Sequence, residues 1–122
     1  EGGFPAEDIV DVSQWINELN GAEFAGITTF PALMYNHEKK IVAPTHNLTT
    51  LGRAAEKLRN SGMTHVEINA PGTTSSVSFA QLAEAGVTQI EPGHGLTGTT
   101  PLHAVSELPE RPAILYLSEV SH

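Results

Sequence analysis

The sequence predicts an α/β domain in which parallel strands alternate with helices. Apolar residues at spacings of three and four, typical of helices, alternate with short runs rich in β-branched residues. The two kinds of segment follow one another at the rhythm of βαβ units, which implies parallel strands joined by right-handed crossovers. Glycine-rich turns at 69–76 and 91–98 each follow a strand candidate. An α/β barrel and a doubly wound sheet both fit this pattern.

Composition and charge restrict the partners. The 122 residues fit one ordinary domain, and 14 acidic against six basic residues give a net charge of −8. This balance argues against nucleic acid, which is bound through clustered Lys and Arg. The chain contains no cysteine, no apolar run approaching the ~18 residues of a membrane span and no basic-then-apolar leader. We therefore expect a cytoplasmic protein without a nucleic-acid or membrane partner.

The first half of the chain predicts helix, strand, loop and helix in that order. Residues 5–19 begin with Pro5 and carry an apolar stripe that includes Trp15, which we expect to pack between the helix and the strands. Residues 22–30 form a strand candidate closed by a proline. The irregular segment 31–44 predicts a long loop or a small hairpin. Thr45 is placed to cap the next helix, whose apolar stripe is Leu48, Leu51, Ala55 and Leu58.

The second half continues the alternation. Residues 63–70 predict a strand, 78–86 a short helix with Ser78 as its cap, and 87–92 a further strand. After Pro101 the pattern changes to a linker-like turn and an extended, β-prone run. We place a domain boundary at that point, so that residues 1–105 form one unit and 106–122 begin another.

The two glycine-rich turns predict a phosphate site. The carboxyl ends of parallel strands meet at one edge of a sheet, so "NAPGTTSS" and "EPGHGLTG" are expected to lie together. Glycine permits close approach of the backbone, and serine and threonine add hydroxyl donors. Four or five hydrogen bonds to a charged group, each worth roughly 1.5 to 3 kcal/mol, hold a dianion without any lysine. No metal site is predicted, because His65, His94, His103 and His122 lack a metal-binding spacing.

These motifs resemble those of the alanine racemase-like, fold-type III pyridoxal phosphate enzymes. "EPGHGLTG" is similar to the turn after their final barrel strand, typically Arg-Pro-Gly-x-x-Leu-Tyr-Gly. "GTTSS" resembles the Gly-Ser-Thr-Pro-Thr phosphate loop of the D-serine dehydratase and D-threonine aldolase branch, and "GITTFPAL" resembles an earlier strand end. The segments "EGGF", "INAP" and "EPGHGLTGTTPLHA" look like those of YhfX-like amino-acid racemases. The resemblance implies the C-terminal portion of a pyridoxal phosphate-binding (β/α)8 TIM barrel followed by the first strand of a C-terminal β domain.

The resemblance also implies roles for individual residues. The cofactor-binding residues would be Phe30, Asn69, Gly72, Thr73, Thr74, Ser75, Ser76, Glu91, Gly93 and His94. Glu91 stands where alanine racemase has an arginine beside the pyridine nitrogen, and a carboxylate there favours the protonated ring. Phe30 replaces a histidine of the family and is expected to pack against the ring face. Two alternatives to these roles remain open. Glu91 would only pair locally at a strand end, and Asn69 would only be a turn residue.

The expected function is that of a fragment of an amino-acid racemase-like enzyme. In the family the Schiff-base lysine ends the first barrel strand, and Lys39, Lys40 and Lys57 are not credible substitutes. Because the chain also opens without Met, we expect a piece of a longer protein, with no catalytic residue predicted within it. A small amino-acid substrate and a homodimer are implied by the resemblance alone. A non-catalytic phosphate- or pyridoxal phosphate-binding module is the alternative function, and a metal hydrolase a third.

Overall fold

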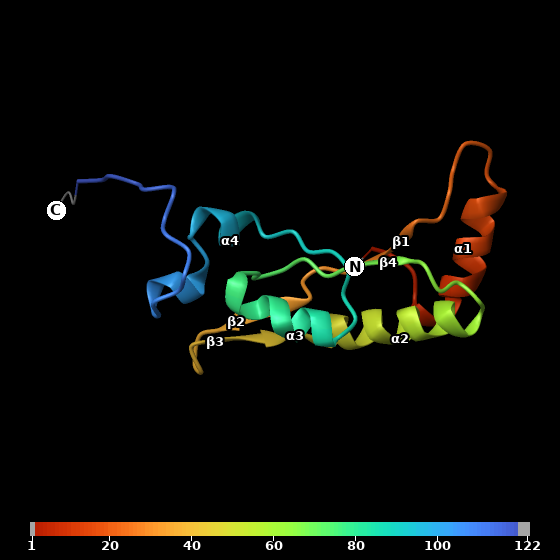
Figure 1. Ribbon diagram of the computed structural model, residues 1–122, viewed down its shortest axis with the longest axis horizontal. Helices are drawn as coiled ribbons and strands as arrows, with labels where there is room; N and C mark the ends of the chain where they lie inside the picture. The colour runs from red at the N-terminus through yellow and green to blue at the C-terminus, as the bar shows by residue number, and fades with distance from the viewer. Residues whose placement is uncertain (1, 120–122) are drawn as a thin grey trace.

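The computed structural model describes residues 2–119, in which short strands alternate with helices as the sequence predicts (Figure 1). His122, to which no role was assigned, lies outside the described residues. Within the described residues, the strands are β1 (Gly26–Thr28), β2 (Leu33–Asn36), β3 (Ile41–Pro44) and β4 (Glu67–Asn69). The α-helices of this range are α1 (Ile9–Glu18), α2 (His46–Asn60), α3 (Phe79–Glu84) and α4 (Gly93–Thr97). The 3₁₀ turns in the same range are η1 (Ala6–Asp8), η2 (Ser76–Ser78) and η3 (Pro101–Ala104).

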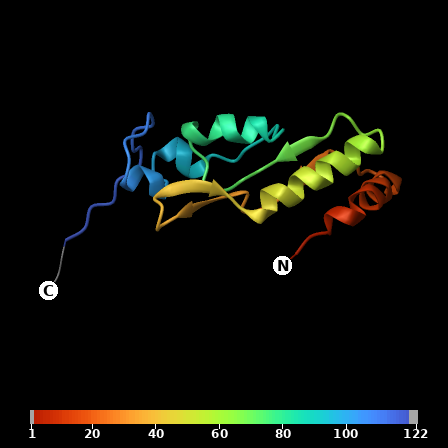
Figure 2. The ribbon, with the colours of Figure 1, turned by 90° about the horizontal axis from the view of Figure 1, so that it is seen from below.

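The parallel arrangement predicted from the sequence is confirmed by β1 and β4. They pair in parallel with Gly26 opposite Glu67 and Thr28 opposite Asn69. A parallel bridge between Asn69 and Gln89 then adds the next segment on the other side of β4. Figure 1 shows α2 and α3 on the same side of these strands, and Figure 2 shows the arrangement from below. The described residues therefore form a mixed α/β structure with two small sheets.

The strand predicted over 87–92 is wrong as a regular strand, because it is reduced to the single bridge at Gln89. The hydroxyl of Thr88 accepts the N–H of Ile68 at 2.8 Å, the donor that a ladder would have used. The N–H groups of Thr88 and Gln89 both point to the Ile68 carbonyl, at 2.9 and 3.1 Å. Local bonding around one residue of β4 thus replaces a regular ladder, although it still sets the two segments side by side.

Segment 31–44 is the small hairpin of the two predicted alternatives. β2 and β3 pair antiparallel, with Leu33 opposite Pro44 and Asn36 opposite Ile41. The Asn36 side chain accepts the N–H of Lys39 at 2.8 Å, which fixes the turn between the strands. The hairpin joins the rest of the fold at its base, where the Ala32 N–H donates to the Pro71 carbonyl at 2.8 Å.

Helix α2 begins at the predicted cap. The Thr45 hydroxyl oxygen accepts the N–H of Asn47 at 3.1 Å and donates its own proton to the Pro31 carbonyl at 2.6 Å. The buried residues of α2 are Leu51, Ala54, Ala55 and Leu58, close to the predicted stripe. One hydroxyl therefore satisfies a helix amide and ties the helix to the start of the hairpin.

Replacing Thr45 with alanine is expected to lower the free energy of unfolding by about 1 to 2 kcal/mol, the usual cost of losing a helix cap. Both hydrogen bonds of the hydroxyl are lost, and Pro31 is left without that donor. Urea denaturation followed by circular dichroism measures the change. Thr45→Ser keeps the oxygen and is expected to lose less than half as much. A loss of the same size in Thr45→Ser would show that the methyl group, not the cap, matters.

The core lies between the strands and helices α2 and α3. Its buried members are Ala32, Leu33, Leu51, Ala70 and Leu82, with partly buried neighbours Ile27, Val42, Leu48, Ile68, Val87 and Ile90. The expectation that Trp15 belongs to the core is wrong, because the residue is 54% exposed. Helix α1 buries the small side chain of Ser13 instead. The indole of Trp15 is left about half exposed among residues 2–119.

The last described residues run on from the fold as an extended segment. Ile114, Leu115, Tyr116 and Leu117 are exposed and form no strand with other described residues. One backbone bond anchors the segment, from the Ala113 N–H to the Thr97 carbonyl at 2.8 Å. The boundary near residue 106 stays a prediction.

Candidate functional site

The two glycine-rich turns leave neighbouring segments of the parallel arrangement. The first begins at Asn69, the last residue of β4, and the second follows Gln89, which bridges to it. The Ala70 N–H donates to the Gln89 carbonyl at 3.1 Å, so the two turns start from adjacent backbone. The predicted meeting of the turns therefore has a structural basis in the pairing of the segments that precede them.

The turns touch each other through glycine. A Cβ atom on Gly95 would lie 2.7 Å from the Thr74 carbonyl oxygen and 3.3 Å from the Ser75 Cα, a space that only a hydrogen can occupy. The Thr74 hydroxyl also donates to the Glu91 carbonyl at 3.2 Å. Gly72 packs equally closely on β2, because its Cβ would lie 2.6 Å from the Leu33 carbonyl oxygen. The second turn, the first turn and the hairpin are thus stacked in that order.

Most amides of the first turn are already engaged inside the chain. The N–H of Thr73 donates to Leu33 at 3.1 Å and that of Thr74 to Gly72 at 2.9 Å. The N–H of Ser75 donates to the Ser78 hydroxyl at 3.0 Å, and that hydroxyl donates to the Ser75 carbonyl at 2.8 Å. Ser78 therefore serves the turn, not the start of α3 as predicted. The donors that this turn can offer a ligand are therefore its hydroxyl groups and the Ser76 N–H, and not a series of backbone amides.

Two serine hydroxyls in the first turn are buried without a partner. Among residues 2–119, neither Ser75 Oγ nor Ser76 Oγ makes a well-aligned hydrogen bond, although the Ser78 N–H faces Ser75 Oγ and the Glu110 carboxylate lies close to Ser76 Oγ. Ser75 itself is 1% exposed. Buried hydroxyls are nearly always hydrogen-bonded in folded proteins, because leaving one unpaired costs roughly 1 to 3 kcal/mol. A polar group bound at the junction of the turns would find both hydroxyls able to donate to it.

The Ser76 N–H already binds an anion, which is the carboxylate of Glu110. Glu110 Oε1 accepts this N–H at 2.5 Å across 34 residues of sequence. That hydrogen bond holds the pKa of the Glu110 carboxyl below its usual value and outweighs the opposing effect of burial. The carboxylate is therefore ionised at neutral pH, and this junction accommodates negative charge.

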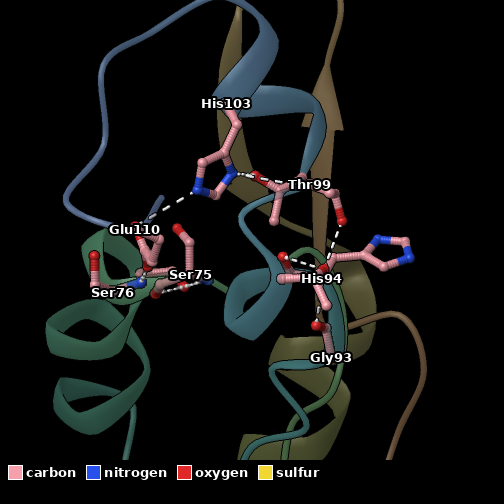
Figure 3. Close-up of polar contacts among 10 residues, drawn as sticks. Ser75, Ser76, Gly93, His94, Thr99, His103 and Glu110 are labelled. Atoms are coloured by element: carbon pink, nitrogen blue, oxygen red, sulfur yellow. Dashed lines mark hydrogen bonds and ion pairs between the residues drawn. The ribbon is translucent and has the colours of Figure 1, made fainter. Parts of the chain in front are cut away.

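His103 completes the polar cluster (Figure 3). Its Nδ1 accepts the N–H of Thr100 at 3.2 Å and lies 2.7 Å from the Thr100 hydroxyl. With Nδ1 as acceptor, the neutral ring carries its proton on Nε2. Nε2 lies 3.6 Å from Glu110 Oε2, too far for a hydrogen bond, and neither atom has a partner among the described residues. Neither residue is predicted as part of the site from the sequence, because Glu110 falls in a linker-like turn and His103 enters only as a metal-ligand candidate.

The second turn offers amides from an exposed backbone. Gly93 and His94 are exposed, and their N–H groups have no acceptor among residues 2–119. The His94 imidazole points away from Ser75, Ser76 and Glu110 (Figure 3), so this residue has only its amide to offer the junction. The Thr97 hydroxyl shares its proton between the carbonyls of Gly93 and His94, at 3.3 and 3.2 Å. These contacts stabilise the single turn of helix that begins at the two amides.

The comparison with known proteins decides the family. Residues 1–101 match the family described as "Alanine racemase, N-terminal domain". The chain belongs to this family. It is 43% identical over all 122 residues to "Uncharacterized protein YhfX" of Escherichia coli (strain K12). It spans 32% of the length of that relative.

The alanine racemase-like chain brings Asn69 and Glu91 together at the strand ends. Asn69 Nδ2 donates to Glu91 Oε1 at 2.6 Å, so these two predicted cofactor-binding residues contact each other directly. Asn69 Oδ1 is buried and has no partner within residues 2–119. Glu91 itself is exposed. The pair fixes the direction of the carboxylate, a geometry consistent both with a local contact and with a role toward a ligand.

Phe30 does not join this cluster. Its side chain is 75% exposed, and it lines an open groove of about 850 Å³ between α1, β1 and α2. The groove is also lined by Phe4, Ile16, Phe24 and Met34. In this alanine racemase-like chain, Phe30 therefore has no contact with the serine hydroxyls, and its packing against a cofactor ring stays a prediction.

No group of three or more His, Cys, Asp or Glu side chains in the described part of the chain is arranged to hold a metal ion. None of the helices within residues 2–119 combines the length and apolar character needed to cross a bilayer.

Proposed function

We propose that this chain supplies the phosphate-binding end of a pyridoxal phosphate-dependent, amino-acid racemase-like enzyme. The observation that carries the proposal is the junction of the two turns, where Ser75 Oγ and Ser76 Oγ are buried without a well-aligned hydrogen bond, beside the carboxylate held by the Ser76 N–H. The family provides the context, because the alanine racemase N-terminal domain is a pyridoxal phosphate-binding barrel. In this proposal the parallel arrangement of β1, β4 and Gln89 is a section of that barrel.

The residues of the junction fit a phosphate monoester. The Ser75 and Ser76 hydroxyls and the Ser76 N–H supply donors from the first turn, and the Gly93 and His94 N–H groups supply donors from the second. Gly95 lets the turns approach within contact distance of each other. Hydrogen bonds to a charged acceptor contribute roughly 1.5 to 3 kcal/mol each, so these donors suffice without a lysine. Pyridoxal phosphate supplies an electron sink that stabilises the carbanion left when an amino acid loses its α-proton.

Glu91 and Asn69 are proposed to serve the pyridine ring. Their contact directs one carboxylate oxygen of Glu91 toward Asn69, which leaves the other for the ring nitrogen. A carboxylate there favours the protonated ring, whereas the arginine typical of the family favours the unprotonated one. The proposal therefore assigns the chain to a branch with the stronger electron sink.

The substrate and the assembly belong to the same proposal. We propose a small amino acid as substrate, racemisation as the reaction and a homodimer as the working form. The lysine that binds the cofactor covalently is proposed to lie outside this chain, because Lys39 and Lys40 occupy the turn of the hairpin and Lys57 an exposed position on α2. This same observation favours the second candidate function, a non-catalytic module that binds pyridoxal phosphate.

The 122-residue chain is expected to bind pyridoxal phosphate at least about tenfold more tightly than pyridoxal, because only the former carries the charged acceptor. Isothermal titration calorimetry measures both affinities. Changing Ser75 and Ser76 together to alanine is expected to reduce the preference, and Thr49→Ala, at an exposed threonine of α2, serves as the control. Equal affinity for the two compounds would contradict the proposal. Racemisation of an amino acid by the full-length protein separates the enzyme from the non-catalytic module.

A further inference from the structure

Glu110 occupies a position that an external anion would use. Its side chain is 19% exposed, and it reaches from the segment after η3 to the Ser76 N–H. The two unpartnered hydroxyls of Ser75 and Ser76 belong to the same turn as that N–H. A carboxylate and a phosphate at one backbone donor exclude each other by charge and by volume. Whatever anion binds here must therefore displace Glu110.

The carboxylate satisfies this position incompletely. Glu110 Oε2 faces His103 Nε2 at 3.6 Å, and each atom lacks a hydrogen bond within residues 2–119. The His103 side chain is only 8% exposed, and the Thr100 N–H fixes its ring by donating to Nδ1. A buried donor is thus held in place, aimed at the anion position, and left unpaired by the group that now occupies it.

A phosphate monoester matches these donors better than the carboxylate does. It presents three strong acceptor oxygens and close to two negative charges at neutral pH. Those oxygens match the Ser76 N–H, His103 Nε2 and the serine hydroxyls, all of which converge on one small region (Figure 3). Among the described residues, the basic side chain that lies within 4 Å of the Glu110 carboxylate is His103, with Nε2 at 3.6 Å from Oε2.

We propose that Glu110 is an internal competitor for the phosphate, and that His103 becomes a ligand of the phosphate once Glu110 has been displaced. The inference rests on the proposed function and adds two residues to its site. Glu110 then acts as a latch on the segment after η3: the junction is closed by a carboxylate until a phosphorylated ligand opens it. His103 Nε2 then donates to a phosphate oxygen in place of Glu110 Oε2, which lies 3.6 Å away.

The test compares Glu110→Gln with Glu107→Gln. Glu107 is exposed, lies in the same segment and carries the same charge, so its replacement is the matched control. Calorimetric titration of the 122-residue chain with inorganic phosphate, and separately with pyridoxal phosphate, measures affinity. Glu110→Gln is expected to bind both about tenfold more tightly, because the displaced group no longer carries a charge. Glu107→Gln is expected to bind as the native chain does.

His103 is tested in the same titrations. His103→Leu is expected to weaken binding about tenfold, because the donor at Nε2 is lost. His103→Gln keeps an N–H donor in a similar position and is expected to recover part of the affinity. Circular dichroism melting of each variant shows whether the fold is retained, and the ³¹P chemical shift of bound phosphate reports the loss of the imidazole contact independently of affinity.

The outcomes separate the inference from the function on which it rests. Tighter binding by Glu110→Gln alone supports both. If the native chain and Glu110→Gln bind with equal affinity, the inference is wrong while the proposed function stands. If Glu107→Gln gains as much as Glu110→Gln, general charge and not the latch governs binding, which also overturns the inference. If none of these chains binds phosphate or pyridoxal phosphate, the proposed function and the inference both fail.

Discussion

Replacing Leu33 with alanine is expected to lower the free energy of unfolding by about 2 to 5 kcal/mol, the largest loss of any single substitution considered. Leu33 is fully buried in the core, where β2 meets the first turn. Its backbone also accepts the N–H of Thr73 at 3.1 Å and packs against Gly72. The cavity left by the side chain would therefore lie directly beneath the phosphate-binding turn.

Met34 is the matched control for this substitution. It follows Leu33 on the same strand, points to the opposite face and is 54% exposed. Met34→Ala is expected to cost less than about 1 kcal/mol, because little apolar surface leaves the core. Urea denaturation followed by circular dichroism measures both variants. Equal losses from the two substitutions would show that the hairpin does not pack on the core as described.

Leu33→Ala also tests whether the turn depends on the hairpin beneath it. If the first turn is held by the core, the substitution is expected to weaken pyridoxal phosphate binding as well as stability. A variant that remains folded at low temperature and binds with native affinity would show that the turn keeps its conformation through Ser78 alone. That result would show that ligand binding by the first turn does not depend on the packing of Leu33 in the core.

Local signals predicted the elements that local interactions form. The cap at Thr45 and the stripe of α2 are each encoded within a few residues, and the structure confirms both. For segment 31–44 the structure selects the small hairpin over the long loop, the other predicted alternative. The adjacency of the two turns was predictable as well, because parallel strands align their carboxyl ends. The strand after Val87 was not, since the Thr88 hydroxyl captures a ladder donor of β4. A side chain that competes with the backbone leaves no periodic trace in the sequence.

The composition of the site itself was only partly predictable. Glycine, serine and threonine predicted a polar junction, but not which amides would be used internally. The Thr73 N–H donates to Leu33, a partner remote in sequence, whereas the Ser75 N–H donates to the hydroxyl of Ser78, three residues further along the chain. Glu110 is remote in sequence and lies in a turn flanked by prolines, where an acidic residue ordinarily indicates a solvated loop. Long-range pairing of one carboxylate with one amide has no signature that a single sequence can show.

Replacing Gly95 with alanine is expected to disrupt the junction and to weaken pyridoxal phosphate binding by about tenfold or more, because an overpacked contact typically costs 1 to 3 kcal/mol. The new Cβ would lie 2.7 Å from the Thr74 carbonyl oxygen, a backbone atom that cannot rotate away. The two turns must then separate, which moves the Gly93 and His94 amides away from the serine hydroxyls. Calorimetry measures binding, and thermal unfolding measures the accompanying loss of stability.

Gly52→Ala is the control, because it makes the same chemical change in open space on the exposed side of α2. Inside a helix this substitution is expected to stabilise the chain by about 0.5 to 1 kcal/mol and to leave binding unchanged. The two glycine-to-alanine substitutions are expected to change the free energy of unfolding in opposite directions. A general effect of alanine cannot produce that difference. If Gly95→Ala bound pyridoxal phosphate as tightly as the native chain, contact between the turns would not be what builds the site. The serine hydroxyls would then have to hold the phosphate without the second turn.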